Sequence, residues 1–113
     1  MSSEGEQRAV CDRVGAPFVP PSAFETVGIA LSTIHEKPLN GLRVAPENGT
    51  CGWYIWGGGE MSTHPDFFQP LHVHHLAERC PAVLPYLAIP PGYRFQIAPD
   101  HEDIWEDQAL LER

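Results

Sequence analysis

The segment from Cys51 to Glu60, which reads CGWYIWGGGE, constrains the fold more than any other part of the chain. Aromatic and β-branched side chains suit a pleated, half-buried surface, so we expect a strand here. The three glycines that follow it reach positive φ without steric cost, so the strand should end near Gly57. Trp53 and Trp56 differ by three positions, so on a strand they face opposite sides and at least one should lie in the core. An abrupt strand end beside Glu60 is typical of one edge of a recognition surface.

The remaining segments predict an α+β fold. Asn48-Gly49 is a dipeptide favoured in tight hairpins, and it should pair the short extended segment 42–45 with the strand 51–56. Further strands are expected at 27–35, where Gly28 permits a bulge, and at 93–97; helices are expected at 66–80 and 81–87. Short turns between strands around a helical middle favour a small antiparallel sheet with helices packed on one face.

A chain of 113 residues fits a single domain. Residues 1–24 contain several prolines and predict an N-terminal arm that could hold one helical stretch and pack through Phe18 and Phe24. Residues 25–113 should form the α+β domain. The first six residues are acidic and lack the features of a secretory signal, and no stretch reaches the roughly 18 apolar residues of a membrane helix, so we expect a cytoplasmic protein.

The charge balance limits the class of partner. Fifteen acidic residues oppose seven basic ones, for a formal net charge of −8. This charge disfavours nucleic acid and anionic membrane as partners and favours a basic protein surface, although solubility alone also explains surplus carboxylates. Three cysteines at wide spacing, Cys11, Cys51 and Cys80, predict reduced and mostly buried thiols.

Histidines offer the clearest enzymatic alternative, since His72-Val73-His74-His75 places three imidazoles within four residues. On the expected helix, His72 and His75 share a face whereas His74 points elsewhere, so the run supplies at most two metal ligands. We therefore expect surface or structural histidines and no metal or other cofactor, with His72 and His75 as weak candidate ligands. Cys80 or Cys51 beside a histidine could act as a nucleophile, but neither lies in a recognisable nucleophile motif.

The acidic C-terminal segment carries the strongest candidate for a binding anchor. Trp105 lies between Asp103 and Glu106, and a large aromatic flanked by acids suits a basic partner surface. The alternative is that the Trp105 side chain packs in the core and holds this segment there. Gly57-Gly58-Gly59 does not predict a phosphate loop, because Glu60 would repel phosphate and no Lys-Ser/Thr pair follows.

Four strings of residues resemble the Imm33 family of bacterial immunity proteins, and the similarity spans about residues 25–111: Pro38-Leu39-Asn40-Gly41-Leu42-Arg43, Gly52-Trp53-Tyr54-Ile55-Trp56-Gly57-Gly58-Gly59-Glu60, Pro90-Pro91-Gly92-Tyr93-Arg94-Phe95 and Asp103-Ile104-Trp105. The resemblance implies a small α+β protein that protects a bacterium from a cognate polymorphic toxin by binding it.

The sequence therefore favours a non-catalytic protein-binding module. We expect Glu60 and the segment 103–107, including Asp103, Glu106 and Asp107, to supply charge around Trp105 or around one of Trp53 and Trp56. Two alternatives stay open: a small metal- or thiol-dependent enzyme that uses His72, His75 and Cys80, and a structural homo-oligomer. A homodimer is also compatible with the sequence.

Overall fold

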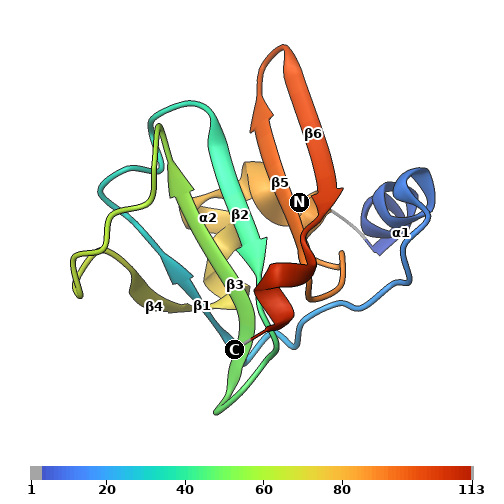
Figure 1. Ribbon diagram of the computed structural model, residues 1–113, viewed down its shortest axis with the longest axis horizontal. Coiled ribbons are helices and arrows are strands. Elements are labelled where there is room, and N and C mark those ends of the chain that lie inside the picture. The colour runs from blue at the N-terminus through green and yellow to red at the C-terminus, as the bar shows by residue number, and fades with distance from the viewer. Residues whose placement is uncertain (1–3, 113) are drawn as a thin grey trace.

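Six strands form one mixed sheet in the order β4-β1-β3-β2-β5-β6 (Figure 1). The computed structural model describes residues 4–112, so Met1–Ser3 of the predicted arm and Arg113 of the predicted domain lie outside the described part. The strands are β1 (Thr26–Ile29), β2 (Leu39–Arg43), β3 (Thr50–Gly57), β4 (Gln69–His72), β5 (Tyr93–Ala98) and β6 (His101–Glu106). The helices are α1 (Glu4–Val14), α2 (Leu76–Arg79) and the 3-10 segments η1 (Val73–His75), η2 (Pro81–Tyr86) and η3 (Gln108–Leu111).

The main core lies between one face of the sheet and the helices α1, α2 and η2. Trp53 and Ile55 of β3 and Phe95 of β5 are at most 1% exposed and pack there with Val10 of α1 and Leu76 of α2. Figure 1 shows α2 behind the sheet. The predicted α+β class, with helices covering one face, is confirmed.

Strand β3 lies in the middle of the sheet and begins after the predicted hairpin. Asn48 and Gly49 have φ of 52° and 84°, as a tight turn with two left-handed residues requires, and β2 pairs antiparallel with β3. On its other side β3 pairs in parallel with β1, with a register shift between Thr26 and Gly28 at the predicted bulge. The expectation of a purely antiparallel sheet is therefore wrong for this one pairing.

The predicted helix over 66–80 is the largest error of the sequence analysis. Gln69–His72 is an edge strand that pairs with β1, and only Leu76–Arg79 is α-helical. The outer edge of β1 needs hydrogen-bond partners, and this need outweighs the approximate helical spacing of the apolar residues. Pro70 is tolerated because β4 lies at the edge of the sheet, where a missing N–H leaves no buried carbonyl unpaired.

The C-terminal segment forms a strand that the sequence analysis did not predict. β6 turns back at Pro99-Asp100 and pairs antiparallel with the whole of β5. Asp107 then caps η3 by accepting a hydrogen bond from the Ala109 N–H at 3.2 Å. Leu110 packs against a second apolar cluster, formed by Ala30, Leu42 and Trp56, so the segment docks on the sheet.

The N-terminal arm contains a helix that belongs to the core. Val10 and Cys11 of α1 are buried, and the Arg8 guanidinium lies 4.0 Å from the centre of the Phe18 ring. Phe24, in contrast, is 80% exposed, so the expectation that it packs the arm is wrong. Among residues 4–112, every helix is too short or too polar to span a bilayer.

Candidate functional site

The face of the sheet opposite α1, α2 and η2 carries the predicted binding residues of β6. Residues that pair directly across an antiparallel ladder share a face, and the pairs here are Arg94 with Trp105 and Gln96 with Asp103. Phe95, between Arg94 and Gln96, points into the main core. Alternation along β5 and β6 therefore places Trp105 and Asp103 on the face opposite α1, α2 and η2.

A groove of about 590 Å³ lies on this face, between the glycine loop that follows β3 and the β5–β6 hairpin. Three predicted residues from two separate segments line it together: Trp56 and Glu60 of the segment 51–60, and Trp105 of β6. The other lining residues are Asn40, Gly41, Gly58, Gly59, Met61, Arg94, Phe95 and Gln96. We call this surface the groove.

The three tryptophans have different roles. Trp53 is 1% exposed in the main core, where its indole N–H donates to the Leu87 carbonyl at 2.9 Å. Trp56 is 5% exposed and forms part of the groove's floor, and its indole N–H donates to the Gly59 carbonyl at 2.8 Å. The prediction that they occupy opposite faces is confirmed, and both are buried. Trp105 is 39% exposed, so it is the indole that a partner can reach.

Arg94 supports Trp105, and the sequence analysis did not select it as a site residue. Its guanidinium carbon lies 5.9 Å from the centre of the Trp105 ring, and its Nη1 forms an ion pair with Asp107 at 3.1 Å. The alternation of Tyr93, Arg94 and Phe95 along a strand was a usable signal, because it places an arginine on the wet face. The ion pair compensates Asp107, whereas Asp103 and Glu60 form no ion pair with any residue in the range 4–112.

The predicted acidic cluster is divided between the two faces of the sheet. Glu106 pairs with Tyr93, whose ring packs on the main core, and therefore lies on the face opposite Trp105. Its carboxylate accepts a hydrogen bond from the Gln108 amide at 2.6 Å. The structure thus brings Asp103 and Asp107 together with Trp105, but it does not bring Glu106 there.

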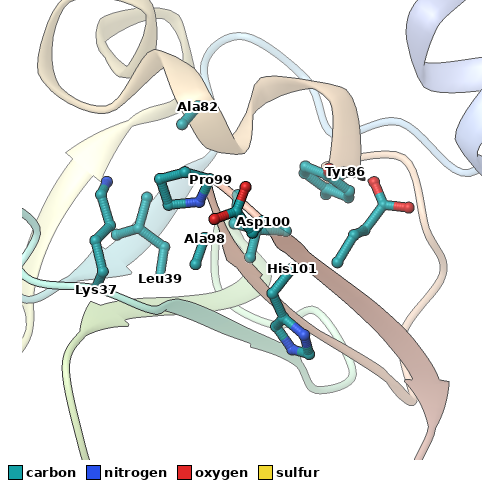
Figure 2. Close-up of a pocket in the computed structure, with 10 residues that line it drawn as sticks. Lys37, Leu39, Ala82, Tyr86, Ala98, Pro99, Asp100 and His101 are labelled. Atoms are coloured by element: carbon teal, nitrogen blue, oxygen red, sulfur yellow. Dashed lines mark hydrogen bonds between the residues drawn. The ribbon is translucent and has the colours of Figure 1, made fainter.

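A second hollow of about 610 Å³ lies beside η2 at the end of the β5–β6 hairpin (Figure 2). The Tyr86 hydroxyl donates to Glu102 at 2.5 Å, and Arg13 forms an ion pair with the same carboxylate at 2.8 Å. Burial and the hydrogen bond to Glu102 raise the pKa of Tyr86 to about 12. Figure 2 shows the His101 ring pointing away from Tyr86, and its Nε2 lies 3.0 Å from the Gln96 side chain. Because Glu102 already has two partners, this hollow is better suited to binding than to acid–base catalysis by Glu102 and Tyr86.

The cysteines provide no activated nucleophile. Cys11, Cys51 and Cys80 are free and buried, as predicted. Burial raises the pKa of the Cys51 and Cys80 thiols, which keeps them protonated at neutral pH. Only the thiolate is a strong nucleophile, so this environment does not favour thiol chemistry.

The histidine run has a different geometry from the one expected on a helix. His72 ends β4, and His74 and His75 lie in η1. The prediction that His74 points away from the other two is wrong, because the potential ligand atoms of all three imidazoles lie within 4.8 Å of one another. All three side chains are exposed.

The chain was also compared with known protein families. The model of the Imm33-like domain matches residues 6–107, which include most of α1 and all six strands. This range begins earlier than the resemblance noted in the sequence, which started near residue 25. No curated protein and no solved structure matches the chain.

Proposed function

Since the chain belongs to the Imm33-like domain family, we propose that it is an immunity protein that neutralises a cognate bacterial toxin by binding it, without catalysis. The family's name suggests an immunity role, and the groove supplies a surface for it. The observation that carries the proposal is the convergence of Trp56 from β3, Glu60 from the glycine loop and Trp105 from β6 on the face of the sheet opposite α1, α2 and η2.

Trp105 has the properties of a binding anchor. It is a large, partly exposed aromatic side chain beside a hollow, and the Arg94 guanidinium backs its ring. Contact with Arg94 restricts the indole before a partner arrives, which reduces the entropy lost on binding. Aromatic anchors of this kind contribute most of the binding energy of many interfaces.

The acidic residues around the anchor favour a basic toxin surface. Glu60 and Asp103 are exposed, and the whole chain carries a net charge of −8. Complementary charge accelerates association and disfavours wrong partners, so these carboxylates should act mainly on the association rate. We place this interaction in the cytoplasm, in keeping with the free, buried thiols of Cys11, Cys51 and Cys80.

The test begins with the genes that flank this one: any toxin-like domain encoded there is expressed in bacteria together with this protein, and the protection of the cells is measured. The double variant Glu60→Lys, Asp103→Lys should associate at least tenfold more slowly with that domain and lose protection. The matched control is Glu47→Lys, Glu78→Lys, which makes the same charge change at exposed residues outside the groove's lining. Equal protection by both double variants would refute the electrostatic part of the proposal.

A separate measurement distinguishes toxin binding from the homo-oligomer alternative. Light scattering of the purified protein alone and with the toxin domain gives the mass of each species. A stable assembly formed without toxin, and no complex with it, would support a structural homo-oligomer and contradict the proposed function.

A further inference from the structure

The edge of the sheet farthest from β6 carries a cluster of three imidazoles, His72, His74 and His75. The ring centres of His74 and His75 are 4.1 Å apart, and those of His72 and His74 are 5.5 Å apart and nearly parallel, with 19° between the ring planes. Each side chain can offer one nitrogen such that the three nitrogens lie within 4.8 Å of one another. The three histidines lie within four consecutive residues, and the change from strand β4 to the 3-10 segment η1 brings their side chains together.

The main chain under the cluster is held by neighbouring segments. His72 pairs with Thr26 in the β1–β4 ladder, and the Val73 N–H donates to the Glu25 carbonyl at 2.9 Å. The His74 N–H donates to the Ala23 carbonyl at 3.2 Å, and the Phe24 ring meets the His74 ring edge-on at 5.9 Å. The Cα positions of the three histidines are therefore constrained, and their exposed side chains keep the freedom to adjust.

We propose that His72, His74 and His75 form a surface site for a divalent transition-metal ion of the zinc class. Zinc–nitrogen bonds of about 2.0–2.1 Å place two ligands of a tetrahedral ion about 3.3 Å apart. The three imidazole nitrogens must therefore move from at most 4.8 Å apart to about 3.3 Å apart, a change of about 1.5 Å or less. Rotation of the exposed side chains supplies this movement without a change in the backbone. Three protein ligands leave the fourth position open to water or to a donor from another molecule.

The chemistry of the ligands defines which ions should bind. Imidazole nitrogen suits Zn²⁺, Ni²⁺, Cu²⁺ and Co²⁺, whereas Mg²⁺ and Ca²⁺ prefer oxygen. The site is separate from the groove, since none of the three histidines lines it. Metal binding and toxin binding can therefore succeed or fail separately.

Titration of the tag-free, full-length protein with Zn²⁺ alone tests the site. We expect one equivalent to bind, and no heat from Mg²⁺ under the same conditions. His72→Ala, His74→Ala and His75→Ala should each lower the Zn²⁺ affinity at least tenfold. His64→Ala and His101→Ala are the matched controls, because these imidazoles lie outside the cluster, and both should keep the affinity of the unsubstituted protein.

Substitution with Co²⁺ gives a second, spectroscopic readout. A visible absorption band of four-coordinate cobalt should appear with the unsubstituted protein and vanish with His74→Ala, the residue that a helical segment would have directed away. Thermal unfolding of the metal-free variants checks that they fold. Zn²⁺ affinity unchanged in all three cluster variants, equal losses in the two controls, or binding of half an equivalent with formation of a dimer would overturn the proposal.

Discussion

Arg43 and Trp53 donate hydrogen bonds to the same main-chain carbonyl, that of Leu87, at 3.2 and 2.9 Å. The Arg43 side chain is 2% exposed, and its other acceptors are the carbonyls of Val19, Cys51 and Ile89 at 2.7 to 2.9 Å. These carbonyls come from the arm, from β3 and from the segment after η2. One buried guanidinium thus joins three parts of the chain that are far apart in sequence.

Loss of this guanidinium should destabilise the fold strongly. Arg43→Met leaves several buried carbonyls without donors, and each such loss costs about 1–3 kcal/mol. We expect the free energy of unfolding, measured by urea denaturation, to fall by at least about 3 kcal/mol. Arg79→Met, at an exposed position, should change it by less than about 0.5 kcal/mol. Similar effects of the two substitutions would show that the hydrogen bonds from Arg43 to these carbonyls contribute little to stability.

Gly57, the last residue of β3, and Gly59, in the loop that follows, should respond differently to substitution. A Cβ at Gly57 would lie 2.1 Å from the Thr33 carbonyl oxygen and 2.7 Å from that of Glu36, so Gly57→Ala forces backbone to move. We expect a loss of about 1–3 kcal/mol in the free energy of unfolding. A Cβ at Gly59 would meet no atom within 4 Å, so Gly59→Ala should be nearly neutral. Equal losses of stability for Gly57→Ala and Gly59→Ala in thermal unfolding experiments would contradict this prediction.

Stability should fall in alkali through Tyr86. Its pKa is about 12 in the folded protein, against an ordinary value of about 10, so the folded state holds the phenol proton more tightly. The resulting stabilisation is complete below about pH 10 and is lost as the pH rises towards 12. Urea denaturation across this range should show a shallower decline for Tyr86→Phe than for the unsubstituted protein. Parallel declines would mean that Tyr86 is not responsible.

Substitution of Trp105 and Trp56 should separate binding from stability. Trp105→Ala removes an exposed side chain, so we expect a loss of less than about 1 kcal/mol in unfolding but a marked loss of toxin affinity. Trp56→Ala opens a cavity beneath the groove and should cost about 3–5 kcal/mol of stability. Calorimetry for binding and urea denaturation for folding distinguish the two effects. Full toxin affinity in Trp105→Ala would remove Trp105 as the anchor.

Local signals in the sequence predicted the elements that depend on neighbouring residues. The aromatic run of β3, the Asn48-Gly49 turn and the alternation of β5 each reflect preferences that act within a few residues. The opposite faces of Trp53 and Trp56 follow from strand geometry alone. The exposure of each indole does not, because it depends on which distant segment covers it: Leu87 lies against Trp53, whereas the loop that contains Phe68 packs near Trp56.

An acidic α+β domain, its central hairpin and its likeness to immunity proteins follow from the sequence alone. Contacts between distant segments, in contrast, make residues 69–72 an edge strand, pair β6 with β5, and thereby bring Glu60 and Trp105 to one groove. The change from this edge strand into η1 also gathers His72, His74 and His75. The N–H and C=O groups at the edge of a sheet form hydrogen bonds with whichever segment lies beside them. The periodicity of residues within one segment does not show which distant segment that will be.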